Sequence, residues 1–270
     1  MNVTKDGFKD RQLHIEDYLQ MVSAEQKEYA EVSAHQRIAE NNDIITDFQT
    51  DNLMERILHK DNLNKAYKKV KSNKGAGGID GMSVDELPGF LKDNQRHLIQ
   101  QIKDGKYKPN PVRRVEIPKE TKGEFRKLGV PTVVDRVFQQ AITQVLSPIY
   151  EKQFSENSFG FRPNRGAHDA LKQCQTNVND GYVYVVDMDL EKFFDTVCQS
   201  KVIEVLSRTI KDGRVISLIH KYLNAGVISG GMFEKTEVGM PQGGPLSPLL
   251  SNIMLNEMDK ELTRRGHRFV

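Results

Sequence analysis

The clearest pattern in the chain is a stripe of hydrophobic residues spaced for one face of an α-helix. It runs from Val134 to Ile149 with apolar residues three or four positions apart, so we predict a helix whose striped face lies in the core. Similar but weaker patterns predict further helices. These cover residues 15–22, 63–70, 83–102, 167–174, 200–210, 215–223 and 247–262.

Alternation of apolar and other residues, the period of a β-strand, occurs at several places. Residues 112–117 and 124–128 predict a hairpin with its turn at Lys122 and Gly123. Residues 227–228 and 236–240 predict a second strand pair across a Gly-Gly turn, and residues 183–190 predict a further strand. Helices and strands do not follow a strict βαβ order, so the pattern indicates an α+β fold.

Two carboxylates stand at the end of the strand predicted over residues 183–190. Asp187 and Asp189 are two positions apart, so they would share one side of that strand. A strand end is a rigid mount for a ligand, and magnesium prefers oxygen donors. Acids in this position are also commonly turn or helix-cap residues, so the spacing alone leaves both interpretations open.

Two motifs in this half of the chain change the picture when they are taken together. Asp189 begins the pattern D-x-x-x-[FY]-F-D, which continues through Phe193, Phe194 and Asp195, and PQGGPLSP follows at residues 241–248. A glycine- and proline-rich loop by itself is typical of an ordinary turn. In this order and spacing, the two motifs resemble the palm motifs of reverse transcriptases, and most closely those of the group II intron-encoded enzymes.

Three more segments resemble blocks of the same family, in the same order. They read NKGAGGIDG at residues 73–81, VEIPKETKGEFRKLGVPTVVDR at residues 115–136 and FGFRPN at residues 159–164. The resemblance covers about residues 51–270 and leaves out a polar N-terminal extension over residues 1–50.

The resemblance implies a right-hand polymerase fold with helix-rich fingers, an incomplete palm sheet and no thumb. We expect the fingers at residues 51–164 and 198–245, and the palm at residues 165–197 and 246–270. The family's Tyr-x-Asp-Asp turn, which supplies further catalytic carboxylates, would follow residue 270. We therefore expect a truncated, inactive part of a larger enzyme, whose exposed sheet edge favours self-association.

The activity that the resemblance implies is RNA-directed DNA polymerisation with a pair of Mg²⁺ ions. Asp189 is implied as the catalytic carboxylate and, with the main-chain carbonyl of Leu190, as a metal ligand. The residues implied to bind the dNTP are Lys119, Arg126, Phe194 and Gln242. Those implied to bind template or primer are Asn73, Lys74, Gly77, Gly78 and Arg162.

Two of these implied roles carry an alternative. Phe194 would exclude the 2′-hydroxyl of a ribonucleotide, although paired phenylalanines are also typical of a core. Arg162 would either touch the template or brace the fingers. The implied partners are an RNA template, group II intron RNA, a DNA primer and dNTPs, and the alternative function is a non-catalytic, maturase-type RNA-binding protein.

Composition adds little to this interpretation. The 270-residue chain is 37% hydrophobic and 28% charged, and its net charge of +2 does not indicate a nucleic-acid partner. Its basic residues are nevertheless concentrated between Lys103 and Lys127, which favours phosphate binding there. The sequence shows no apolar run of membrane-spanning length and no signal peptide, and Cys174 and Cys198 lack metal-ligand spacing, so we expect a cytoplasmic protein.

Overall fold

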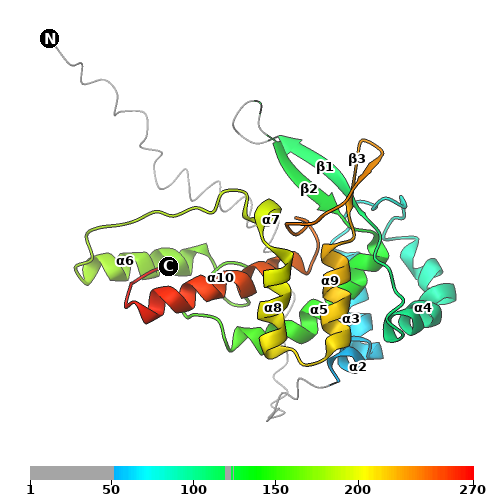
Figure 1. The fold of residues 1–270 in the computed structure, drawn as a ribbon, viewed down its shortest axis with the longest axis horizontal. Coiled ribbons are helices and arrows are strands. Elements are labelled where there is room, and N and C mark those ends of the chain that lie inside the picture. Colours follow the sequence, from blue (N-terminus) through cyan, green and yellow to red (C-terminus); the bar gives the residue numbers. More distant parts are fainter. Residues whose placement is uncertain (1–51, 119–122, 124) are drawn as a thin grey trace. The chain divides into compact units, whose positions relative to one another are not determined.

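The computed structural model describes residues 52–118, 123 and 125–270 (Figure 1). The helix expected at residues 15–22 and the extension over residues 1–50 lie outside the described residues. Lys119 and Lys122, at the tip of the expected hairpin, also lie outside them.

The core is organised around one long helix, α5 (Val133–Glu151), which confirms the strongest helical stripe. Helices α2 (Leu53–Ile57), α3 (Lys60–Ser72) and α10 (Ser247–Arg264) pack against it. Ile142 and Leu146 on α5 are fully buried. The helix begins at a side-chain cap, because the Thr132 hydroxyl accepts a hydrogen bond from the Asp135 N–H at 3.2 Å.

Three other predicted helices are present close to their expected positions. They are α4 (Leu87–Lys103), α8 (Gln199–Thr209) and α9 (Gly213–Leu223), and the last two lie side by side (Figure 1). The capping box before α4 forms, since Glu86 accepts hydrogen bonds from the Ser83 N–H at 2.8 Å and the Ser83 hydroxyl at 2.7 Å. α4 begins four residues later than Ser83, after a turn.

A four-stranded sheet runs in the order β2-β1-β3-β4. β1 (Val112–Pro118) and β2 (Phe125–Val130) form the expected antiparallel hairpin, and β1 also pairs in parallel with β3 (Val227–Ser229). The partner of β3 was wrongly predicted at residues 236–240. It is β4 (Met232–Glu234), because Gly230 and Gly231 both have positive φ and reverse the chain within two residues.

The region between α5 and α8 departs most from the sequence prediction. Residues 183–190 form no strand in the described structure, and Val183, Tyr184, Val185 and Val186 are each 73–94% exposed. A strand needs a neighbour for its N–H and C=O groups, and no strand among the described residues pairs with this segment. The strand expected at residues 183–190 is therefore not formed.

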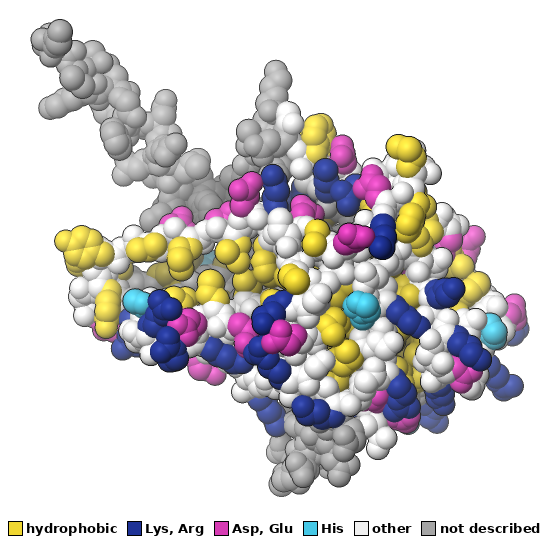
Figure 2. Space-filling view, in the orientation of Figure 1, with side chains coloured by type: hydrophobic (Ala, Val, Ile, Leu, Met, Phe, Trp, Pro, Cys, Tyr) yellow, Lys and Arg dark blue, Asp and Glu magenta, His cyan; other side chains and the backbone are white. Residues whose placement is uncertain are grey.

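The helix before that segment is also less buried than expected. α6 (Ala167–Asn179) is present, but none of its residues is buried against the rest of the described chain, so its expected inner side is not packed. Cys174 on α6 and Cys198 before α8 are both exposed free thiols. Figure 2 shows the resulting hydrophobic side chains gathered on the face over α6 and the segment that leads to α7 (Phe193–Thr196).

Helices expected in fingers and palm share a single hydrophobic core. Leu146 of α5, Leu206 of α8 and Leu250 of α10 belong to the same buried cluster. The division into fingers and palm segments therefore stays a prediction.

Candidate functional site

The short helix α7 and the loop that precedes α10 are joined through their main chains. The Met240 N–H donates to the Phe194 carbonyl at 2.7 Å, and the Gly239 N–H donates to the Val197 carbonyl at 2.8 Å. Gly239 has φ +80°, and a Cβ built on it would lie 2.8 Å from the Phe194 carbonyl oxygen. A glycine is therefore needed here for both its conformation and the close approach.

The same loop is attached to the base of the hairpin. The Gly129 N–H of β2 donates to the Gln242 carbonyl at 2.6 Å, and a Cβ on Gly243 would lie 2.7 Å from the Gly129 carbonyl oxygen. The Ser247 hydroxyl also donates to the Pro241 carbonyl at 2.6 Å. The loop at residues 239–244 is thus held between α7, β2 and the start of α10.

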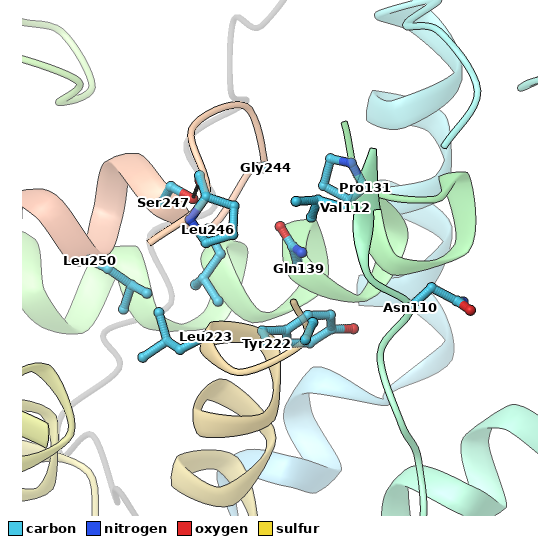
Figure 3. Close-up of a pocket in the computed structure, with 12 residues that line it drawn as sticks. Asn110, Val112, Pro131, Gln139, Tyr222, Leu223, Gly244, Leu246, Ser247 and Leu250 are labelled. Atoms are coloured by element: carbon cyan, nitrogen blue, oxygen red, sulfur yellow. Dashed lines mark hydrogen bonds between the residues drawn. The ribbon is translucent and has the colours of Figure 1, made fainter. Parts of the chain in front are cut away.

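A small cavity lies behind this loop (Figure 3). Its volume is about 20 Å³, and its lining includes Gln139 from α5, Tyr222 from α9 and Gly244 from the loop. The Gln139 side chain fills the place beneath Gly244, where an added Cβ would lie 2.3 Å from its Oε1. The cavity is far too small for a nucleotide.

Phe194 and Gln242 each lie beside these main-chain contacts. Phe194 is half-buried and packs edge-to-face on Phe193 with the ring centroids 5.6 Å apart. Both rings therefore contribute to packing against the core. Gln242 is half-buried, and its side chain forms no hydrogen bond within the described part of the chain.

Arg126 lies on the outer part of the hairpin, where it is exposed and pairs in register with Ile117. Its guanidinium has no hydrogen bond or ion pair to any residue that the structure describes, so it is available to an anion. Lys119, the second residue expected to bind a triphosphate, lies outside the described residues. Arg126 and Gly129 lie on the same strand, so the hydrogen bond from Gly129 to Gln242 connects the strand that carries Arg126 to the loop at residues 239–244.

The acidic candidates are exposed rather than mounted on a strand. Asp187, Asp189 and Asp195 are exposed, and their carboxylates make no hydrogen bond or ion pair with described residues. The Leu190 carbonyl accepts from the Phe193 N–H at 3.3 Å.

This donor set fits only part of a magnesium site. The Asp189 carboxylate and the Leu190 carbonyl are hard oxygen donors of the kind that Mg²⁺ prefers. However, the described residues contain no group of three or more acidic, histidine or cysteine side chains placed to hold a metal ion. A pair of ions would need additional carboxylates.

The glycine-rich loop at residues 75–81 is fixed by two arginines. Arg136 donates to the Ala76 carbonyl at 2.6 Å, and Arg113 donates to the Gly77 carbonyl at 2.8 Å. A Cβ on Gly78 would lie 2.6 Å from the Thr132 Cα, so this glycine is required by packing. Burial lowers the pKa of the Arg136 guanidinium, whose Nε has no hydrogen-bond partner in the described chain. Asn73 and Lys74, beside the loop, are exposed.

Arg162 has the contacts of a brace. Its guanidinium forms a bidentate pair with Glu151, at 3.0 Å from Nε and 2.6 Å from Nη2 to Oε1. Its Nη1 donates to the carbonyls of Ser155 and Ser158, and the side chain is 2% exposed. Of its two expected roles, these contacts support bracing rather than template contact.

A buried polar cluster supports the start of β1. The Asp135 carboxylate accepts hydrogen bonds from the Tyr107 hydroxyl at 2.7 Å, the Thr132 hydroxyl at 2.7 Å and the Asn110 N–H at 3.1 Å. Burial raises the pKa of Asp135, although these hydrogen bonds oppose the shift. Burial also raises the pKa of Tyr222, whose hydroxyl has no partner among the described residues. The cluster ties α5 to the connector that leads into the hairpin.

Several supporting residues carry no motif. Gly129, Gln139 and Gln199 position the loop at residues 239–244. In the sequence, Gly129 is marked only as a glycine inside a strand, and Gln139 only as a polar residue beside an apolar stripe. Gln199 is the start of a helix, where a polar residue is unremarkable in sequence.

The family described as "Reverse transcriptase (RNA-dependent DNA polymerase)" matches residues 117–270. The group II intron-encoded protein LtrA of Lactococcus lactis subsp. cremoris is 39% identical over 234 residues, which are 87% of this chain and 39% of LtrA. Protein YkfC of Escherichia coli is 38% identical over 79% of this chain and 57% of its own length.

More distant matches agree with these. Nuclear intron maturase 2, mitochondrial, of Arabidopsis thaliana is 31% identical over 47% of this chain and 22% of its own length. A chain in a structure described as a partial Cas6-RT-Cas1--Cas2 complex matches with a TM-score of 0.54 and 23% identity, covering 78% of this chain and 35% of that one. This structural match concerns the fold alone. The chain spans 39% of the length of LtrA and 57% of the length of YkfC.

Over the described residues, none of the helices combines the length and the apolar character that crossing a bilayer requires.

Proposed function

Because this chain belongs to the reverse transcriptase family, we propose that it forms part of an RNA-directed DNA polymerase encoded by a group II intron. It would contribute the nucleotide-binding fingers and the first metal-binding aspartate. Since the chain spans only part of its relatives, polymerisation by the whole protein belongs to the proposal as well.

The observation that supports this most is the set of main-chain bonds around the loop at residues 239–244. Phe194 and Gln242 are far apart in sequence, yet Met240 bonds to Phe194 at 2.7 Å and Gln242 bonds to Gly129 at 2.6 Å. Gly129 in turn belongs to the strand that carries Arg126. Gln242, Phe194 and Arg126, which are suited to a base, a sugar and a phosphate, are thus connected through the same set of main-chain hydrogen bonds.

Each of these residues has a chemistry suited to one part of a dNTP. Arg126 offers an unpaired guanidinium, which binds phosphate oxygens in a bidentate manner. The Phe194 ring would exclude a ribose 2′-hydroxyl by steric contact. Gln242 would lie against the new base pair, with glycines after it that permit a close approach.

Asp189 and the Leu190 carbonyl would hold magnesium. When bound, the metal activates the primer hydroxyl and neutralises charge on the triphosphate. The exposed, unpaired carboxylate of Asp189 is open to such an ion without breaking an existing contact.

The hairpin also offers a surface for RNA. Arg126 and Lys127 are adjacent on β2, so their side chains leave the strand on opposite faces and both are exposed. Asn73 and Lys74 add a polar and a positive group beside the glycine-rich loop. Binding through such contacts should weaken as salt concentration rises, because counterions are released from phosphate.

A maturase-type RNA-binding function is the second candidate. One relative is named as an intron maturase, and the basic side chains of the hairpin could bind RNA without any metal. This alternative predicts RNA binding without templated selection of a nucleotide.

Templated nucleotide binding separates the two functions. The purified 270-residue chain would be mixed with a poly(rU) template, an oligo(dA) primer ending in a dideoxynucleotide, and Mg²⁺. Binding of fluorescent dATP and dGTP would then be compared. The polymerase proposal expects dATP to bind more tightly than dGTP, because only dATP pairs with the template.

Substitution of Arg126 supplies the matched test. Arg126→Ala should weaken dATP binding, whereas Arg96→Ala, which removes an equal charge from an exposed position of α4, should not. Equal binding of dATP and dGTP, with RNA binding intact, would reject the polymerase proposal and favour the maturase function.

A further inference from the structure

Gln199 stands at a junction that none of the sequence motifs includes. It is the first residue of α8 and is 5% exposed. Its side-chain Nε2 donates to the Leu223 carbonyl at 3.0 Å and to the Gly239 carbonyl at 2.9 Å. Two facing acceptors require the NH₂ end of the carboxamide, so its orientation is fixed by its partners. Gln199 therefore joins the end of α9 to the start of the loop at residues 239–244.

The loop meets the Phe194 turn at this same point. Gly239 donates through its N–H to Val197 and accepts through its C=O from Gln199, while the next N–H, of Met240, donates to Phe194. Three hydrogen bonds thus converge on two consecutive residues. Of the three, only the bond from Gln199 comes from a side chain, so only that one can be removed by a simple substitution.

We propose that Gln199 is a positioning residue that sets the distance between Phe194 and Gln242 and thereby controls the choice of deoxyribose over ribose. The inference rests on the proposed function of the site. Gln199 touches no nucleotide and acts through the Gly239 carbonyl. Without that bond, the loop keeps only its two main-chain bonds to Val197 and Phe194, so it can move further from the Phe194 turn and the space for a 2′-hydroxyl can widen.

A purely structural role would have a different signature. If Gln199 served only to cap α9, its loss would lower stability and leave sugar selection unchanged. The structure limits that role, because the Thr236 hydroxyl also donates to the Leu223 carbonyl, at 2.9 Å. The end of α9 keeps a partner when Gln199 is replaced, whereas the Gly239 carbonyl loses its side-chain donor.

The test compares two variants of the full 270-residue chain. Gln199→Met keeps a side chain of similar length and removes the donor. Val202→Ala removes buried methyl groups from the same helix without touching the loop, so it controls for general loss of stability. In Gln199→Met, the amide hydrogens of Gly239 and Met240 should exchange on the order of tenfold faster, because the loop that carries them loses one of its three hydrogen bonds at this junction and opens more often. In Val202→Ala, the exchange of these two amide hydrogens should speed up no more than the loss of global stability explains.

The functional readout is the ratio of dATP to ATP binding on the poly(rU) and oligo(dA) complex. Gln199→Met should lower this ratio several-fold, and Val202→Ala should preserve it. A Gln199→Met protein that keeps the original ratio overturns the inference while leaving the proposed function standing. If the unsubstituted chain does not prefer dATP to dGTP, the proposed function fails, and the inference on sugar selection fails with it.

Discussion

Two stretches of this chain are rich in apolar residues and end in opposite environments. α5 lies at the centre of the core, with Ile142 and Leu146 fully buried. Residues 183–190 carry four consecutive large apolar or aromatic side chains, and all four are largely exposed. The difference lies in the backbone, since a helix satisfies its own hydrogen bonds while an extended segment depends on a neighbouring strand.

The comparison teaches that hydrophobicity and burial are separate properties. The exposed segment follows α6, which is itself unburied among the described residues, so neither of them buries the other in this structure. The same region carries Asp189, the acid that we propose as a magnesium ligand. The candidate site thus combines a firmly seated loop with an acid that no described contact fixes.

The largest expected effect comes from comparing the two stretches directly. Leu146→Ala should destabilise the chain by about 2–5 kcal/mol, because it leaves a cavity in a packed core. Val185→Ala should change the free energy of unfolding by less than about 0.5 kcal/mol, because Val185 contacts mainly solvent. Urea unfolding measures both. A loss for Val185→Ala as large as that for Leu146→Ala would show that the segment is packed.

A smaller effect is expected where a methyl group is added at a glycine in the packed region. Gly78→Ala should cost about 1–3 kcal/mol, because its Cβ would overlap the Thr132 main chain. Gly89→Ala is the control, since it lies on α4 with no atom within 4 Å of an added Cβ. That change should stabilise the helix by roughly 0.5–1 kcal/mol. Thermal unfolding of the two variants should therefore shift in opposite directions.

In the packed region, the buried carboxyl group of Asp135 should also make stability depend on pH. Asp135→Asn should destabilise the chain by about 1–2 kcal/mol at low pH, because the amide cannot accept all the hydrogen bonds of the carboxyl group. Burial raises the folded-state pKa of Asp135, so the folded state binds the proton more tightly than the unfolded state. This contribution to stability is present below the unfolded pKa and is lost as pH rises through the folded pKa.

The difference between the original chain and Asp135→Asn should therefore shrink as pH rises from 4 to neutral values, about 7. Urea unfolding at several pH values measures it. A difference that grows with pH would mean that hydrogen bonds, rather than burial, dominate the pKa of Asp135.

The smallest expected change in stability belongs to Asp189. Asp189→Ala should alter the free energy of unfolding by less than about 0.5 kcal/mol, because the carboxylate is exposed and unpaired in the described structure. With Fe²⁺ in place of Mg²⁺, oxidative cleavage of the main chain near residue 189 should be lost in Asp189→Ala and kept in Glu191→Ala. Cleavage that persists in Asp189→Ala would remove this residue from the metal site.

Sequence patterns predicted the local parts of the fold well. The α5 stripe, the β1–β2 hairpin and α9 were predicted because their contacts lie within one helix or between adjacent strands. The segment at residues 183–190 was wrongly predicted as a strand, because alternation records suitability for a sheet and not the presence of a partner. The partner of β3 was misplaced for a related reason, since the glycine turn brought a nearer segment into register.

The motifs named side chains for the candidate site, whose roles stay predictions, but they did not indicate the main-chain contacts that hold these residues. Phe194, Gln242 and Arg126 were identified by their motifs, and their supporting contacts run mostly through main-chain N–H and C=O groups. Such contacts leave little trace in a sequence beyond a glycine where chains approach closely, as at Gly239 and Gly243. Arg162 shows the opposite case, because its residue type suits both a brace and a ligand, and only its contacts with Glu151 favour the brace.

The parallel pairing of β1 with β3 has a consequence for how the protein is made. Val112 of β1 aligns with Val227 of β3, and the intervening chain forms α5, α6, α8 and α9. On the ribosome, the hairpin can close early, but its outer neighbours emerge only after those helices have been synthesised. Such distant pairing is slow to form. A nascent chain that stalls before Val227 would carry the hairpin with the edge of β1 that pairs with β3 still uncovered.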